Sequence, residues 1–247
     1  MLHQNSYMVL FPNTKCNNHL RNSILMKNIL LGILLILSMI SKAGIVDYKT
    51  SPWHITVNKR TEYTGIALSN GRIGIMPSQL PFKVESIILN NVYDKESEQG
   101  VSKLLRGINF ANLEMVIDGD TISENTISDW QQRLDMKEAS LTTSFRFKEK
   151  AEIEYTIYAL RGMPFAGLID VTVKALIKNI NISVAGEISC PEEYKNPNST
   201  FRILKDNEIE MPLLQTVAKS PFGRHTLAAT ATFIFDHDFP VLKHSRK

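Results

Sequence analysis

The chain has 247 residues, of which 43% are hydrophobic and 21% are charged, the composition of an ordinary globular protein. This length is enough for one large domain with a substantial core. The 28 basic residues nearly balance the 25 acidic ones, and a formal net charge of +3 gives no indication of nucleic-acid binding, which needs a clustered excess of Lys and Arg.

The N-terminal region has the layout of an export signal that begins at Met26. Lys27 supplies a positive charge, residues 29–40 form an apolar run, and the sequence Ser-Lys-Ala at 41–43 places small residues before a cleavage site. The run is too short to cross about 30 Å of hydrocarbon as a permanent helix. We therefore predict a signal peptide over 26–43, an upstream extension over 1–25, and a periplasmic or secreted protein with no membrane attachment after cleavage.

Beyond residue 44, apolar and polar residues alternate with a period of two, which is typical of strands with one buried face. Three stretches show the pattern best: NLEMVID from Asn112, SLTTSFRF from Ser140 and EIEYTIYAL from Glu152. Three later stretches rich in β-branched residues continue it: LIDVTVKALI, INISVAGEI and HTLAATATFIF. Tyr155 falls on the inferred core face of its strand.

Few other elements are predicted. The stretch ESEQGVSKLL, residues 96–105, predicts one short helix, while charge and turn formers predict loops over 94–107 and 190–200. About a dozen short strands in one continuous segment predict an all-β fold, a single large antiparallel β-sandwich over 44–236. A short tail over 237–247 follows it.

The stretch LSNGRIGI, residues 68–75, contains Asn70-Gly71, a favoured pair for the two central positions of a type I′ hairpin turn. A phosphate-binding loop would need Gly-Lys-Ser/Thr, and a dinucleotide loop would need GxGxxG before a helix. The pattern predicts a β-hairpin.

Three blocks in this order resemble the N-terminal domain of glycoside hydrolase family 65. They are LSNGRIGI, NFANLEMVIDGDTI from Asn109, and ISDWQQRLDMKEASLTTSF from Ile127. The family contains maltose, trehalose and kojibiose phosphorylases and acid trehalase-like hydrolases. The resemblance covers residues 53–235, and it departs from the family at Arg72, where tyrosine is usual, and at Ala139, where glycine is usual.

The resemblance implies a galactose-mutarotase-like super-sandwich and α-linked glucosides as substrate, cleaved with inversion. In this family the chemistry resides in an (α/α)6 barrel that follows the sandwich. The resemblance therefore also implies that the barrel is encoded separately or missing, and that this chain is inactive alone. An export signal favours hydrolysis over phosphorolysis. Two alternatives stay open: a stand-alone carbohydrate-binding module, and a structural or adhesive sandwich that binds no sugar.

The individual residues give no catalytic pair. Inverting cleavage needs an acid and a base about 6.5–9.5 Å apart, and the carboxyl candidates are Glu85, Glu114, Asp118, Asp120, Asp129, Asp135, Glu192 and Glu193. We expect these to be solvated, or to fix turns and strand ends, as Asp135 does in the third block. We predict no metal or other cofactor, because two cysteines, Cys16 and Cys190, give no ligand spacing and the DHDF stretch with His244 is typical of a polar tail.

The remaining expectation from the sequence is that certain residues contact a sugar. Asn70 and Arg72 lie at the predicted hairpin tip, where their side chains can reach a substrate or a partner domain. Trp130 lies in a polar, loop-like context, where its ring can stack on a pyranose. These three residues are the predicted carbohydrate-binding residues, with an α-glucoside oligosaccharide as the ligand.

The predicted cleavage is directly testable. N-terminal sequencing of the exported protein is expected to begin at Gly44, because Ser41 and Ala43 supply the small residues that signal peptidase requires. Export of a chain that still begins at Met1 would contradict both the cleavage site and the assignment of 1–25 as an upstream extension.

Overall fold

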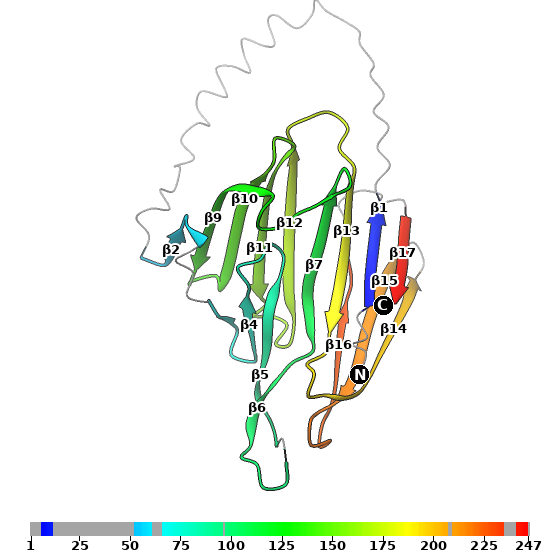
Figure 1. Cartoon of the computed structure of the whole chain (residues 1–247). Coiled ribbons are helices and arrows are strands. Elements are labelled where there is room, and N and C mark those ends of the chain that lie inside the picture. Colours follow the sequence, from blue (N-terminus) through cyan, green and yellow to red (C-terminus); the bar gives the residue numbers. More distant parts are fainter. Residues whose placement is uncertain are drawn as a thin grey trace, which may run out of the picture.

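A computed structural model describes residues 6–11, 52–60, 66–95, 97–206, 209–234 and 241–246. The predicted signal peptide, Cys16 and the DHDF stretch lie outside these residues. Within them no helix is long and apolar enough to cross a membrane. The structure is built from antiparallel strands, as predicted for an all-β sandwich (Figure 1).

The strands form four sheets. One sheet has the order β17 (Val241–Arg246), β1 (Ser6–Phe11), β13 (Ile182–Ser189), β7 (Asn109–Ile117) and β8 (Asp120–Thr121). A second has the order β12 (Gly167–Ala175), β11 (Ala151–Ala159), β10 (Ser140–Phe147), β9 (Ile127–Asp135) and β2 (His54–Val57). The third is β14 (Lys195–Asp206), β15 (Ile209–Lys219) and β16 (Thr226–Ala231), and the fourth is β3 (Leu68–Ser69), β4 (Ile73–Pro77), β5 (Val84–Asp94) and β6 (Lys103–Arg106).

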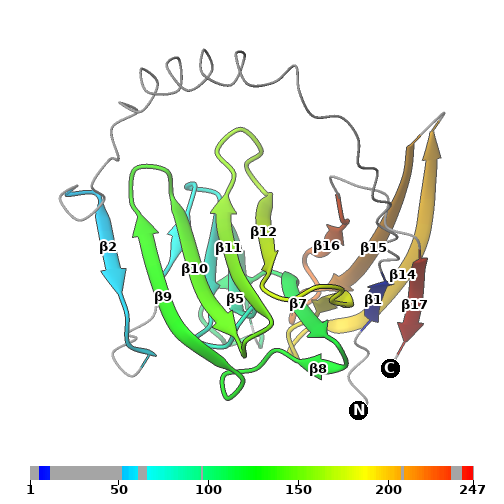
Figure 2. The same cartoon turned by 90° about the horizontal axis from the view of Figure 1, so that it is seen from above.

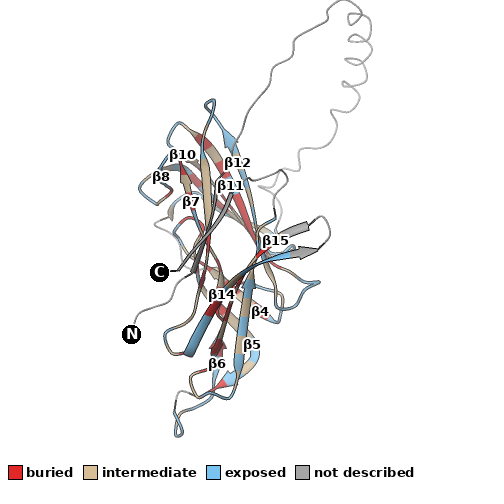
Figure 3. Ribbon diagram, turned by 90° about the vertical axis from the view of Figure 1, so that its right-hand side faces the viewer, coloured by how far each residue is buried: buried red, intermediate tan, exposed pale blue. Residues whose placement is uncertain are grey.

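The core forms where the predicted alternation turns apolar residues inward. On β10 and β11 the buried rows are those expected from the sequence: Leu141, Thr143, Phe145, Phe147, Ile153, Tyr155, Ile157 and Ala159. These rows face strands β4, β5 and β7 across the interior (Figure 2). A smaller cluster joins β13 to β15 around Ile188 and Leu214. Figure 3 shows buried segments along the inner strands, while the loops, the hairpin tips and much of β12 and β14 are exposed.

The turn between β4 and β5 inserts Phe82 into this core. Its ring centroid lies 4.6 Å from that of Tyr155 and 5.9 Å from that of Phe145. Its backbone amide donates to the Tyr155 hydroxyl over 3.3 Å. Phe82 has a φ of 60°, a left-handed conformation that costs a residue with a side chain about 1–2 kcal/mol. Burial of the ring contributes about 1.5–3 kcal/mol and offsets this cost.

Two predicted elements are wrong, and two strands form where none was predicted. Residues 97–102 form turns and Lys103–Arg106 is strand β6, so no helix forms there within the described residues. Residues 195–200, predicted as loop, begin strand β14, which pairs with β15 from Asp206 back to Lys195. Strands β1 and β17 lie in the segments taken as an extension and a tail, for which no element was predicted. Pairing with distant strands overrides weak local signals in these segments.

The hairpin at Asn70 forms, but its turn is not type I′. Asn70 pairs with Ile73, so the two central residues are Gly71, with a φ of 88°, and Arg72. Glycine with positive φ at the first central position is the arrangement of type II′ turns. The turn at Asp118-Gly119, between β7 and β8, does have positive φ at both central residues, 50° and 82°.

Gly107 offers a test of how tightly the core is packed. A Cβ atom there would lie 2.9 Å from Cγ2 and 3.3 Å from Cβ of the buried Ile87. Gly107→Ala is therefore expected to lower the free energy of unfolding by about 1–3 kcal/mol, as overpacking does. Gly162→Ala is the control, because a Cβ there meets nothing within 4 Å. Equal urea midpoints for the two variants would contradict this packing.

Candidate functional site

Asn70 joins the β3–β4 hairpin to the loop between β11 and β12. Its side-chain amide donates to the carbonyl oxygens of Leu160, over 2.7 Å, and Pro164, over 3.0 Å. Its side-chain oxygen accepts from the amides of Arg72 and Ile73. All of its hydrogen-bonding groups are thus used to hold two chain segments together.

Two asparagines of the NFANLE stretch, Asn109 and Asn112, hold strand β7 to the start of strand β5. The Asn109 side chain donates to the carbonyl oxygen of Val84 over 2.7 Å, and the Asn112 side chain accepts from the Val84 amide over 2.8 Å. The Leu113 amide donates to the carbonyl oxygen of Phe82. These bonds place the Phe82 turn against β7.

Asp135 closes the turn between β9 and β10, which confirms its predicted role at a strand end. Its carboxylate accepts from the amides of Lys137 and Glu138 and lies 2.9 Å from Nε2 of His54. Burial is the largest influence and raises the pKa of Asp135. The Glu138 amide, the His54 ring and the Lys137 amide together outweigh it, so this pKa lies below its ordinary value of 3.8.

Arg72 and the neighbouring loops form one continuous surface, which we call the loop end. The Arg161 guanidinium donates to the carbonyl oxygen of Lys137 over 2.8 Å, and the Met136 amide donates to that of Trp53 over 2.9 Å. The loop end consists of Trp53, Arg72, Met136, Arg161, Met163 and Phe165. The structure therefore brings Asn70 and Arg72 into one surface, as expected for a hairpin tip, and adds residues that the sequence analysis did not single out.

Trp130 lies elsewhere, and its expected position in an exposed loop is wrong. It is in the middle of β9, only 8% exposed, and belongs to the main core. A β-bulge opposite Phe145 accommodates two residues of β9, Asp129 and Trp130, and Asp129 adopts a φ of 52°. Because a bulge shifts the alternation by one, Ile127 and Trp130 both face the core although they are three residues apart.

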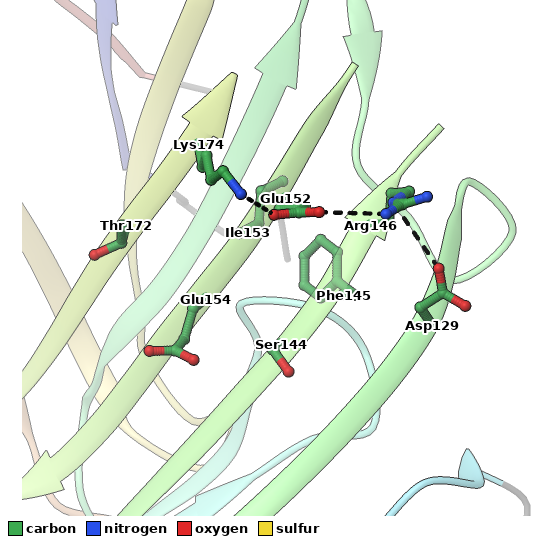
Figure 4. Close-up of a pocket in the computed structure, with 9 residues that line it drawn as sticks. All are labelled: Asp129, Ser144, Phe145, Arg146, Glu152, Ile153, Glu154, Thr172 and Lys174. Atoms are coloured by element: carbon green, nitrogen blue, oxygen red, sulfur yellow. Dashed lines mark hydrogen bonds and ion pairs between the residues drawn. The ribbon is translucent and has the colours of Figure 1, made fainter. Parts of the chain in front are cut away.

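The outer face of β9–β12 carries a hollow of about 420 Å³ (Figure 4). Arg146 lies 3.2 Å from Glu152 and 3.9 Å from Asp129, and Lys174 lies 2.8 Å from Glu152. The bonds from Lys174 and then Arg146 lower the pKa of Glu152. A general acid in glycoside cleavage needs a raised pKa. The hollow is therefore lined by ion pairs that keep Glu152 ionised, which does not suit a general acid.

The other carboxyl groups with a shifted pKa behave in the same way. In the described part of the chain, these are Asp94, Asp118 and Asp120, and each has a lowered pKa. Asp118 accepts from the Asn181 amide and contacts Lys150, while Asp120 contacts Lys148. The contacts of Asp118 and Asp120 hold the turns at that end of the sandwich, in agreement with the expectation that carboxyl groups of this chain fix turns.

Asp94 lies close to Ser220 and His225, the residue types of a nucleophilic triad, but their geometry is different. The Ser220 hydroxyl accepts from the His225 backbone amide, while Nε2 of His225 contacts the Tyr93 carbonyl oxygen. Ser220 is fully buried, and Asp94 accepts from the Phe222 amide. The three residues fix the β15–β16 turn against β5.

Cys190 is a free thiol, and burial, followed by the charge of Glu193, raises its pKa to about 11. A thiol with such a pKa is protonated at neutral pH and is a poor nucleophile. Within the described residues, no group of three His, Cys, Asp or Glu side chains is placed to hold a metal ion.

These observations define the class: an all-β sandwich domain whose polar motif residues hold strands and turns together. The chain belongs to glycoside hydrolase family 65. The sequence profile described as "Glycosyl hydrolase family 65, N-terminal domain" matches residues 53–236, and this match confirms the resemblance of the three blocks.

Two relatives carry the same printed name. The chain is 35% identical over 187 residues to a "Kojibiose hydrolase" of Mucilaginibacter mallensis, across 75% of this chain and 28% of that protein. It is 31% identical over 191 residues to a "Kojibiose hydrolase" of Flavobacterium johnsoniae, across 76% of this chain and 28% of that protein. The chain thus matches a little over a quarter of the length of these relatives.

The lowered pKa of Asp135 predicts a pH-dependent contribution to stability. Asp135→Ala is expected to lower the free energy of unfolding near neutral pH by about 1.5–3 kcal/mol, the value of hydrogen bonds to a charged group. Because the folded-state pKa lies below 3.8, the contribution is present above that value and is lost as the pH falls through the folded-state pKa.

Urea unfolding of both proteins at neutral and strongly acidic pH measures this. The wild type and Asp135→Ala are expected to converge in acid. Asp135→Asn is the control, because it keeps an acceptor for the two amides and removes the charge. A difference between wild type and Asp135→Ala that is independent of pH would contradict the assignment.

Proposed function

We propose that this sandwich is the N-terminal domain of an exported hydrolase that cleaves α-linked glucosides, with kojibiose as the first substrate to test. The observation that carries the proposal is the family match over residues 53–236, together with two relatives named for kojibiose hydrolysis. The catalytic acid and base belong to the part of such an enzyme outside this domain, an (α/α)6 barrel. The sandwich shapes one side of the substrate pocket and supports the barrel.

Side-chain hydrogen bonds favour a role for this domain in supporting the rest of the enzyme. The three sequence blocks shared with the family contribute Asn70, Asn109, Asn112 and Asp135, and each of these side chains bonds to backbone groups of another segment or turn. In this chain these motif residues therefore hold the shape of the domain. Among the described residues, the carboxyl groups with a clearly shifted pKa all have a lowered one, the opposite of what an acid that donates a proton to a leaving glucoside needs.

A stand-alone carbohydrate-binding module is the second candidate. Such a module presents aromatic rings along one sheet face, where they stack on successive sugars. The large exposed aromatic side chains of the described residues are Trp53, Tyr93 and Phe165. They lie beside β2, at the end of β5 and in the β11–β12 loop, so they do not share a sheet face. This arrangement favours the enzyme domain.

A chimera tests the proposal. Residues 53–236 of this chain replace the matching segment of the Mucilaginibacter mallensis protein, and release of glucose from kojibiose is measured. The chimera is expected to retain activity, whereas the same protein with the segment deleted and the present chain alone are expected to have none. Kojibiose hydrolysis by the present chain alone would contradict the assignment of catalysis to another domain.

Binding measurements separate the two candidates. Titration calorimetry of the present chain with kojibiose, maltose, nigerose and trehalose is expected to give no heat of binding, because the described surface has no row of aromatic rings. Binding of any of them, combined with a chimera no more active than the deletion, would favour the carbohydrate-binding module.

A further inference from the structure

We infer that the loop end is the surface on which this domain docks against the rest of its enzyme; the inference rests on the proposed function. Met163, Phe165, Trp53 and Met136 are 61%, 59%, 54% and 42% exposed. With Ile55 and Leu168 beside them, they are six of the fifteen large hydrophobic residues that the described surface exposes. Apolar side chains gathered in this way mark a surface that another body covers.

The shape of the loop end suits a protein surface rather than a sugar. It extends from the β11–β12 loop, past the β9–β10 turn, to Trp53 next to β2, across the full width of a five-stranded sheet. Neighbouring strands are about 4.8 Å apart, so the row is about 19 Å long. None of its residues lines the hollow of Figure 4.

The loop end is also held in place before any partner binds. Asn70 fixes the loop through Leu160 and Pro164, and Arg161 fixes it to the neighbouring turn through the Lys137 carbonyl oxygen. Loops ordered in advance lose little conformational entropy on association. An exposed loop that is held in place by such hydrogen bonds is therefore suited to be a docking surface.

Charge indicates the chemistry of the occupant. Arg72, Lys137 and Arg161 carry positive charges around the apolar residues, against the carboxylates of Glu138 and Asp135, and Asp135 already contacts the His54 ring. The Arg72 guanidinium has no hydrogen bond or ion pair to any residue that the structure describes. The occupant is accordingly an apolar surface rimmed by carboxylates. We assign it to the remainder of the hydrolase, because 28% coverage leaves most of each relative outside the matched domain.

Hydrogen exchange tests the assignment in two proteins, the full present chain and the chimera with the Mucilaginibacter mallensis hydrolase. Docking is expected to slow amide exchange over residues 160–168 by about tenfold or more in the chimera. The β5–β6 hairpin tip is the internal control and is expected to exchange at equal rates in both. Equal rates at 160–168 would overturn the docking surface.

Substitutions give a second readout. Met163→Ser with Phe165→Ser is expected to shorten the half-life of the chimera's kojibiose hydrolysis on heating and to leave the unfolding temperature of the isolated chain unchanged. Val101→Ser is the matched control, since Val101 is 80% exposed but lies at the β5–β6 tip. Arg72→Glu reverses the charge and is expected to shorten the half-life of the chimera, as the double variant does. Arg72→Lys keeps the charge and is expected to leave the half-life unchanged, as Val101→Ser does.

The two proposals fail separately. An active chimera in which the loop-end variants behave like Val101→Ser would overturn the docking surface and leave the proposed function standing. An inactive chimera that nevertheless protects residues 160–168 would support docking and count against kojibiose hydrolysis.

Discussion

The position of one side chain, Phe82, constrains the arrangement of the sheets. Its ring forms a three-ring cluster with those of Phe145 and Tyr155, so the turn between β4 and β5 is fixed to strands β10 and β11. Its carbonyl oxygen accepts from the Leu113 amide, which fixes the same turn to β7. Three sheets thus meet at a residue whose backbone is in a left-handed conformation. The burial that offsets this strain is available only when all three are assembled, which makes their association cooperative.

Much of the fold follows from local pattern, and its failures have identifiable causes. Strict alternation predicted the buried faces of β10 and β11, including Tyr155, because both strands have one buried and one wet face. The bulge at Asp129 breaks the alternation in β9, so a buried tryptophan reads as part of a polar loop. The long β14–β15 hairpin includes segments rich in lysine and asparagine, and pairing between the two strands decides their structure.

For the candidate site, prediction from the sequence is limited in a different way. The sequence singled out Asn70, Arg72 and Asp135 because they lie in blocks that resemble a family, but resemblance does not say whether a residue reacts or holds the chain. Hydrogen-bond partners do say so, since the Asn70 side chain bonds to backbone groups, and the Asp135 carboxylate bonds to two backbone amides and the His54 ring. Phe165 and Met163 lie in a short loop with no pattern of its own. Their importance follows from exposure, which only a three-dimensional arrangement reveals.

The bonds of Asn70 also set the length of the loop that they hold. One side-chain amide contacts the carbonyl oxygens of residues 160 and 164, so the chain between them must span a fixed gap. One inserted residue there would pull a carbonyl away from the amide, whereas the turn around Gly100 closes on itself through Ser97. Added sequence, such as an affinity tag or a fluorescent label, therefore belongs at residues 97–100. Natural variation in length is for the same reason expected at this hairpin and not between residues 160 and 164.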